Sequence, residues 1–251
     1  MEGYGKETYG AEWAADYDQI WSGGHPMWSG GLAAMIERLL ELAGGGRVLE
    51  LAIGTGRVAL PLVARGVDLT GIDISPEMVS RLRAKPSGDQ IPVTMGDFAD
   101  VGVDGSFRLI YLVFNTLFAL LDREEQIRCF ANVAAHLEPG GRFVIEAFVP
   151  DLARFDRGQR ISTQGIRLDR VTIEASRHDP VGQRVDSHLI QITEQGIRLL
   201  PVAIRYSWPS EIDLMARLAG LSLEHRWGGW DHEPFDGASQ RHVSVYRQPA
   251  E

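Results

Sequence analysis

The sequence predicts an α/β protein built on a doubly wound, mostly parallel sheet of seven strands. Short apolar runs alternate with helical patterns through the first 150 residues, which is typical of parallel strands buried between helices. After residue 208 one more helical pattern and two further strand patterns follow. The stretch between these two parts alternates with a period of two residues, so we expect an antiparallel β insertion after the fifth strand.

The core elements follow from apolar runs and from residues typical of helix ends. Ser75 and Pro76 are expected to start a helix, as a capping residue followed by a proline at the first helical position. Asp122 followed by Glu125 resembles a capping box at another helix start. The core helices should begin near Arg57, Pro76 and Arg123, and the strands should span residues 47–52, 67–73, 91–97, 107–114 and 141–148.

The chain is expected to form one domain with four parts. Residues 1–43 should be a helical segment, with an aromatic helical pattern over 11–21, and residues 44–150 should form the ligand-binding core. Residues 151–208 are expected to be three antiparallel strands that form a flap on the substrate side. Residues 209–251 should supply the closing helix and strands.

Composition excludes several classes of function. The 251 residues carry a net charge of −9, which disfavours binding to nucleic acid or to an anionic membrane. A single cysteine, Cys129, excludes an internal disulfide, and no histidine has metal-ligand spacing, so no metal is expected. The start of the chain shows no signal-peptide pattern, and the apolar run 109–121 is too short to span a bilayer. We expect a soluble, cytoplasmic protein.

A glycine loop joins the first expected strand to the helix after it. Gly54, Gly56 and Ala59 match the G-x-G-x-x-A pattern of dinucleotide-binding loops, and Asp73 ends the second strand where a ribose-binding acid belongs. A lone match of this kind is weak, because other cofactors also use a glycine loop at this place.

Glu50 distinguishes between these cofactors. A carboxylate at the end of the first strand would repel a pyrophosphate at short range. S-adenosylmethionine carries no phosphate, and it offers an ammonium, a sulfonium, ribose hydroxyls and an adenine amine, all suited to carboxylate acceptors. Glu50, Asp73 and Asp97 stand at three successive strand ends. This pattern favours a methyl donor over a dinucleotide.

Four motifs, in order along the chain, resemble those of class I S-adenosylmethionine-dependent methyltransferases. They are Glu50-x-x-x-Gly54-Thr55-Gly56, Asp73-Ile74-Ser75-Pro76-Glu77-Met78, Gly96-Asp97-Phe98 and Leu137-Glu138-Pro139-Gly140-Gly141. The match runs from Val48 to Phe148. Ala52 departs from the family, which commonly has glycine there.

The resemblance implies roles for the matching residues. The glycine loop would pass under the amino-acid part of the cofactor, Asp73 would bind the ribose, and Asp97 with Phe98 would contact adenine. Asn115 would lie near the transferred methyl, and S-adenosylhomocysteine would be the product. The implied cofactor-binding set is Tyr17, Trp28, Glu50, Ala52, Gly54, Gly56, Arg57, Asp73, Ile74, Met78, Asp97, Phe98 and Asn115.

A second, looser resemblance covers most of the chain. Tyr9 followed by Tyr17-Asp18, an aromatic at Trp28, Glu146 and a late Gly237-x-Ser239-x-Arg241 are similar to N-methyltransferases of nucleotide-linked amino sugars in antibiotic biosynthesis. This subgroup also carries a β insertion. The resemblance implies that Tyr9 and Glu146 are catalytic and orient an amine, and that the substrate-binding residues are Tyr9, Glu146, Phe148 and Arg241. Arg241 suits an anionic diphosphate.

One departure bears on the mechanism. The subgroup can carry a histidine just past the fourth strand, and this chain has Ala119 in the apparent match. A free amine needs little help from a base, because proximity and alignment supply most of the acceleration. Three functions stay open: amino-sugar N-methylation, O- or C-methylation of another small metabolite, and a nicotinamide oxidoreductase or binding-only fold. A homodimer is compatible with each.

Overall fold

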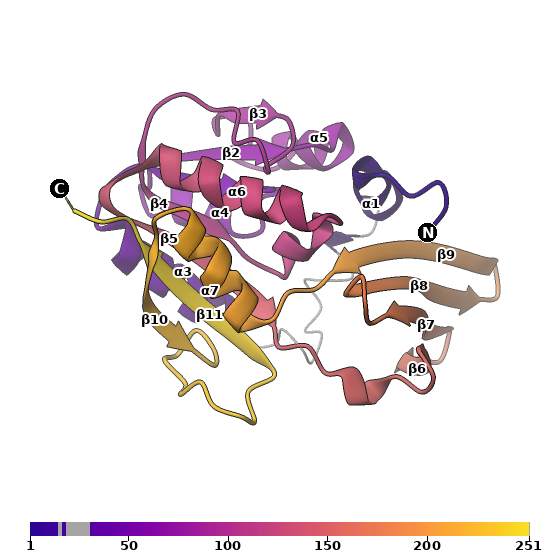
Figure 1. Cartoon of the computed structure of the whole chain (residues 1–251). Helices are drawn as coiled ribbons and strands as arrows, with labels where there is room; N and C mark the ends of the chain where they lie inside the picture. The colour runs from indigo at the N-terminus through magenta and orange to yellow at the C-terminus, as the bar shows by residue number, and fades with distance from the viewer. Residues whose placement is uncertain (15–16, 19–30, 251) are drawn as a thin grey trace.

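The computed structural model describes residues 1–14, 17–18 and 31–250. Seven strands of this part form one sheet in the order β10-β11-β5-β4-β1-β2-β3 (Figure 1). Strand β11 runs antiparallel to both β5 and β10, and the other neighbours pair in parallel. The predicted doubly wound, mostly parallel sheet is confirmed. Its strands are β1 (Val48–Leu51), β2 (Leu69–Asp73), β3 (Val93–Met95), β4 (Phe107–Leu112), β5 (Leu137–Phe148), β10 (Ser222–Trp227) and β11 (Arg241–Arg247).

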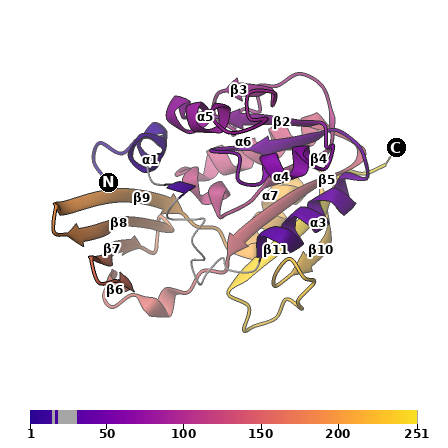
Figure 2. The same cartoon turned by 180° about the vertical axis from the view of Figure 1, so that it is seen from behind.

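Helices cover both faces of this sheet because successive strand residues point to opposite sides. One apolar cluster joins Leu109 and Tyr111 of β4 to α3, α4 and α5, and another joins Ile110 and Leu112 to α6 and α7. The helices around the sheet can be followed in Figures 1 and 2. Cores on both faces make the strands continuously apolar, which is the pattern that the sequence shows. The helices are α3 (Gly31–Ala43), α4 (Ala59–Val63), α5 (Pro76–Arg83), α6 (Arg123–His136) and α7 (Pro209–Leu218).

Two expected helix starts can be compared with the structure. The Ser75 hydroxyl accepts a hydrogen bond from the Met78 amide at 3.2 Å, and Pro76 follows as expected. Asp122 caps α6 by accepting from the Glu124 amide at 2.7 Å. The expected reciprocal capping role of Glu125 is wrong, because its carboxylate forms an ion pair with Lys6 instead.

The N-terminal helix α1 (Lys6–Trp13) starts before the aromatic pattern expected over residues 11–21. Tyr9 and Trp13, one helical turn apart, stack with ring centroids 5.3 Å apart. Trp13 is buried against Met78 of α5 and Leu200 of the insertion. The helix therefore bridges the core and the insertion. Tyr17 of the aromatic pattern is described, whereas residues 15–16 and 19–30, which include Trp21, lie outside the described part.

The insertion forms a second sheet of four strands rather than the expected three. The strand expected over residues 165–178 instead contains a turn between Ile166 and Arg170, with the Arg167 amide bonded to the Arg170 carbonyl at 2.8 Å, and its first two residues end a preceding strand. The missed strand reads QRISTQGI, whose polar residues hide the period-two pattern. A short helix η2 (Leu152–Arg154) precedes the strands in the order β6 (Gln159–Ile166), β7 (Arg170–Asp179), β8 (Arg184–Thr193) and β9 (Gly196–Arg205).

The two faces of the insertion differ in exposure. Leu200 and Val202 lie on the inner face against α1. The outer face leaves apolar side chains in solvent, including Ile161 at 79% and Ile197 at 69% exposure. Strand β9 contacts the short helix η1 (Thr116–Ala119), which follows β4. The insertion thus lies beyond the carboxyl end of β4 (Figure 2).

A buried polar network fixes the end of the insertion to the core. The guanidinium of Arg205, which is 6% exposed, donates to Gln126 of α6 at 2.8 Å and to Glu211 of α7 at 2.7 Å. Gln183 accepts from the same guanidinium at 2.9 Å. A buried charge is tolerated where its donors are satisfied in this way. Among the described helices, none is long and apolar enough to cross a membrane.

Candidate cofactor and acceptor site

The glycine loop takes a conformation that few residues other than glycine adopt. Gly54 and Gly56 have φ of 56° and 79°, and a Cβ atom on Gly56 would lie 2.4 Å from Leu82 Cδ1. Ala52 also has a positive φ of 55°, in the left-handed region that disfavours side chains. This explains why glycine suits position 52 in related loops. The loop brings its backbone close to whatever ligand lies above it.

Asp73 is joined to this loop by hydrogen bonds. Its Oδ2 accepts from the Gly54 amide at 2.7 Å, and its Oδ1 accepts from the Ser75 amide at 2.8 Å. Burial raises the pKa of Asp73, against the lowering by these backbone donors. The structure therefore brings together the loop and the second-strand acid that the sequence singled out. Each carboxylate oxygen retains a lone pair for a further donor.

Glu50 lies at the end of β1 and is 4% exposed. Its Oε2 accepts no hydrogen bond from any described residue. Burial raises the pKa of Glu50 to about 8, although the adjacent Tyr111 and Arg57 act against the shift. A buried carboxylate oxygen without a partner is costly unless a ligand supplies the donor.

Glu50 lines a cavity at the carboxyl ends of β1 and β4. The Arg57 guanidinium lies 4.6 Å from the centroid of the Phe114 ring, and the Tyr17 ring meets Phe114 edge-on at 6.5 Å. Burial raises the pKa of Tyr17 to about 12, so its phenol is neutral near pH 7. The described lining consists of Tyr17, Glu50, Leu51, Ala52, Ile53, Gly54, Thr55, Arg57, Val58, Val113, Phe114 and Thr116.

These residues fit the amino-acid end of S-adenosylmethionine. The unpartnered Glu50 oxygen suits an ammonium, and Arg57 suits a carboxylate. A cavity lined by a carboxylate beside the glycine loop is unfavourable for a pyrophosphate. When bound, the cofactor supplies an electrophilic methyl group.

The remaining predicted cofactor residues lie farther along the same edge of the sheet. Ile74 is 37% exposed, while Met78 and Phe98 are buried in apolar clusters. Lys6 of α1 forms an ion pair with Asp97, whose Oδ1 also accepts from the Ala99 amide at 2.9 Å. The N-terminal helix is thereby fixed to the third strand end. Trp28 lies outside the described residues.

The end of β4 has an unusual backbone. Phe114 and Asn115 have φ of 65° and 62°, two successive left-handed residues that are not glycine. Such conformations cost energy and are held by their surroundings. Glu146 Oε2 accepts from the Phe114 amide at 3.0 Å, and Asn115 Oδ1 accepts from the Phe148 amide at 2.7 Å. Strand β5 therefore holds the turn that forms one wall of the cavity.

The predicted acceptor residues lie in three places. Tyr9 is on α1, stacked on Trp13, and burial raises its pKa well above the ordinary value. Phe148 ends β5 and packs edge-on against Phe118, with ring centroids 4.9 Å apart. Arg241 begins β11 in register with Phe148. The electrostatic influence of Arg241 on Glu146 lowers the pKa of that carboxyl, while burial raises it more strongly.

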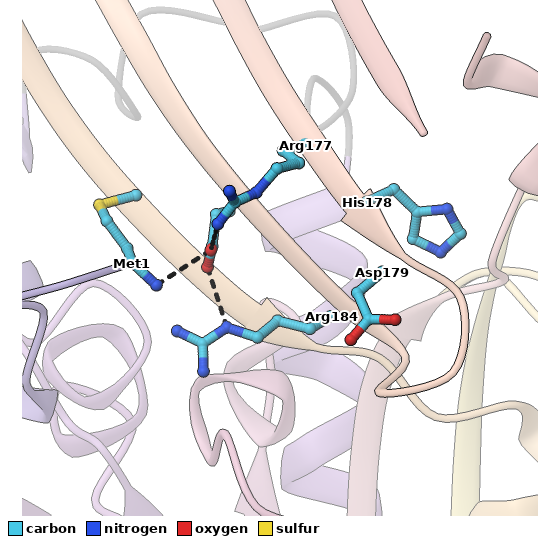
Figure 3. Close-up of a pocket in the computed structure, with 6 residues that line it drawn as sticks. Met1, Arg177, His178, Asp179 and Arg184 are labelled. Carbon is cyan, nitrogen blue, oxygen red and sulfur yellow. Dashed lines mark hydrogen bonds and ion pairs between the residues drawn. The ribbon is translucent and has the colours of Figure 1, made fainter. Parts of the chain in front are cut away.

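A separate pocket of about 370 Å³ lies on the insertion, away from the glycine loop. Two carboxylates, Asp179 and Asp186, line it, and Asp186 pairs with the Met1 amine at 2.9 Å, with Arg184 at 2.9 Å and with Arg177 at 3.3 Å (Figure 3). The Asp186 carboxylate is thus already occupied by cations of the protein. The arrangement fixes the N-terminus on the insertion, and this pocket shares no described lining residue with the cofactor cavity.

Several residues of the site were not anticipated from the sequence. Trp230 donates to Glu146, Lys6 pairs with Asp97, and Phe114 forms a cavity wall. The Gly228-Gly229 pair before Trp230 could have indicated a turn. The other two depend on contacts between distant segments, for which the sequence offers no local signal.

Fold and site together define the class as the S-adenosylmethionine-dependent methyltransferases. The methyltransferase domain family matches residues 48–141, the segment from β1 to the start of β5. The structure of the CcbJ methyltransferase from Streptomyces caelestis is 38% identical, covers 98% of this chain and all of its own, and superposes with a TM-score of 0.89. This chain belongs to that methyltransferase family, and the nicotinamide oxidoreductase alternative is set aside.

Two further relatives differ in their reported acceptors. The cypemycin N-terminal methyltransferase of a Streptomyces species is 29% identical over 206 residues, which is 80% of this chain and 82% of that protein. CalS10, an amino pentose methyltransferase from Micromonospora echinaspora, has a TM-score of 0.68 at 21% identity, covering 94% of this chain and 96% of its own. The latter likeness shows the fold.

Proposed function

We propose that this enzyme transfers the methyl group of S-adenosylmethionine to the nitrogen of a small-molecule amine, specifically a nucleotide-diphosphate-linked amino sugar. The observation that supports this proposal is that the phenols near the cavity are neutral at pH 7 and that the Glu146 carboxylate already accepts two hydrogen bonds. A hydroxyl acceptor needs a base that removes its proton. An amine that is already deprotonated attacks directly once it is aligned with the methyl–sulfur bond.

The candidate bases among the described residues are either neutral near pH 7 or assigned to another contact in this proposal. Burial keeps the phenols of Tyr9 and Tyr17 neutral by raising each pKa. Both oxygens of Glu146 already accept hydrogen bonds, from Phe114 and Trp230. Glu50 lines the part of the cavity that suits the cofactor's ammonium. In our proposal Tyr9 orients the nitrogen through its hydroxyl, and Glu146 positions the β4 turn beside the methyl group.

The acceptor's anionic part is assigned to Arg241. Arg241 is partly exposed, and its charge lowers the pKa of Glu146, so its guanidinium lies near the β4 turn. Arg241 pairs in register with Phe148, two residues past Glu146 on β5. A diphosphate bound there would hold the sugar against the β4 turn. The insertion, which contributes no described residue to the cofactor cavity, would cover this side as a flap.

A peptide N-terminus is the second candidate acceptor. The relative that is 29% identical over most of this chain is an N-terminal methyltransferase. A peptide α-amine needs no base either, once deprotonated. It would not need a phosphate partner at Arg241, and this difference separates the two acceptors.

The test is a transfer assay with methyl-labelled S-adenosylmethionine and matched acceptors: a nucleotide-linked amino sugar, its hydroxyl analogue, a short peptide and a phenol. We expect label on the nitrogen of the amino sugar, located by mass spectrometry and NMR. Label on the peptide amine alone would support the second candidate. Label on the hydroxyl analogue or the phenol, with none on either amine, would overturn N-methylation.

A further inference from the structure

Asp18, Thr55 of the glycine loop and Lys85 are joined in a closed ring of contacts. Asp18 Oδ1 accepts from the Thr55 hydroxyl at 2.6 Å, and Asp18 Oδ2 pairs with Lys85 Nζ at 2.7 Å. The same ammonium donates to the Thr55 carbonyl at 2.8 Å. Thr55 is in the loop and Lys85 follows α5, so three segments distant in sequence meet at one carboxylate.

This ring lies next to a residue that lines the cofactor cavity. Tyr17, which precedes Asp18, lines the cavity together with Glu50 and Arg57. Its ring packs edge-on against Phe114 on the opposite wall. Because both carboxylate oxygens of Asp18 are bonded, the backbone of Tyr17, which directly precedes it, has little freedom to move. The position of Tyr17 over the cavity therefore depends on Asp18.

We propose that Asp18 is a positioning residue which, through Thr55 and Lys85, holds Tyr17 closed over the bound cofactor and slows its release. Asp18 lies outside the cavity and touches no reacting atom. It acts through Tyr17 on one side and through the glycine loop on the other.

The electrostatics agree with a functional ion pair. Partial burial acts to raise the pKa of Asp18, but the hydrogen bonds from Lys85 and Thr55 outweigh it and lower that pKa. The side chains of Asp18 and Lys85 are 43% and 29% exposed. An ion pair with this exposure is screened by salt, so the closed position should weaken as ionic strength rises.

The experiment measures S-adenosylhomocysteine dissociation from the full chain by stopped-flow displacement. We expect Asp18→Ala to speed dissociation roughly tenfold, the factor for one charge-assisted hydrogen bond. Lys85→Met should speed dissociation by a similar factor. The double variant should dissociate no faster than either single variant, because both changes break the same ring of contacts. Glu37→Gln, which removes the exposed 2.9 Å ion pair with Arg65, is the matched control and should leave the rate unchanged.

A second readout uses the protein without cofactor. The Tyr17 phenol should titrate near 12 in the wild type, measured as the absorbance difference from Tyr17→Phe. In Lys85→Met, which keeps the Asp18 charge that itself raises the Tyr17 pKa, that pKa should fall toward the ordinary value, because an opened segment exposes the phenol to water. High salt should speed dissociation from the wild type and have less effect on Asp18→Asn.

Two results would overturn the proposal. One is an unchanged dissociation rate in folded Asp18→Ala, with the melting temperature confirming the fold. The other is strictly additive effects of the Asp18 and Lys85 changes, which would mean that the two residues act independently.

Discussion

The indole nitrogen of Trp230 donates a hydrogen bond to the Glu146 carboxylate over 2.8 Å, with both side chains buried. The other Glu146 oxygen accepts from the Phe114 amide at 3.0 Å. One side chain thus connects the segment after β10 to the left-handed turn at the end of β4. We infer that Glu146 acts on the reaction by holding this turn in place.

The Glu146→Gln change should therefore reduce stability. The amide has one acceptor oxygen, so one of the two donors, Trp230 or Phe114, is left buried without a partner. We expect the free energy of unfolding to fall by about 1–3 kcal/mol, measured by urea denaturation. Glu124→Gln, on the exposed side of α6, is the control and should change it little. Unaltered stability with abolished activity would instead point to a direct catalytic role.

Asp73→Ala should weaken cofactor binding. The carboxylate holds the Gly54 amide, and we propose that it also accepts from the ribose hydroxyls, so we expect a loss of about 1.5–3 kcal/mol in calorimetry with S-adenosylmethionine. In parallel, NAD(H) should give no heat of binding with the wild type. Equal affinity in the folded variant would refute the ribose assignment.

Arg241→Ala tests the diphosphate contact. Loss of one charged contact should raise KM for a nucleotide-linked amino sugar about thirtyfold, which corresponds to about 2 kcal/mol of binding free energy. Affinity for S-adenosylmethionine should stay the same, since Arg241 does not line the cofactor cavity. For a peptide acceptor the same change should have little effect. An unchanged KM for the nucleotide sugar would refute the assignment of Arg241 to the diphosphate.

The pH–rate profile separates an amine from a hydroxyl acceptor. With an amine, the rising limb of kcat/KM should follow the pKa of the acceptor and persist in Glu146→Gln. Tyr9→Phe should lower kcat and leave cofactor affinity nearly untouched, because we propose that its hydroxyl orients the acceptor nitrogen. A limb that disappears in either variant would identify that residue as a base and favour O-methylation.

Strand and helix order followed from the sequence because the main sheet is covered on both faces. Buried parallel strands such as Phe107–Leu112 are continuously apolar, and Ser75-Pro76 starts a helix by local chemistry alone. The strands of the insertion were harder to predict from the sequence. Its strand Gln159–Ile166 is half-exposed and mostly polar, so burial left no alternating signal there.

Some residues of the candidate site could likewise be predicted from the sequence, and others could not. Glu50, Gly54 and Asp73 could be placed at one edge because the ends of neighbouring parallel strands always meet. The Asp18–Lys85 pair and the Lys6–Asp97 pair could not, since each joins segments that are distant in sequence. Glu146 illustrates the limit: its place at the end of β5 was predictable, but its bond to Trp230 was not.

We propose that Glu50 receives the cofactor's ammonium. The pKa of about 8 leaves Glu50 roughly nine-tenths protonated at pH 7 in the free protein. A cation beside the carboxylate stabilises the ionised form and lowers that pKa. Binding must then release a proton to the solvent, and the Glu50→Gln variant has none to release.

The decisive measurement is the proton release on binding S-adenosylhomocysteine at pH 7, obtained by calorimetry in buffers of different ionisation enthalpy. The wild type should release close to one proton, and Glu50→Gln should bind more weakly and release almost none. Equal proton release by the two proteins would contradict the assignment of Glu50 to the cofactor's ammonium.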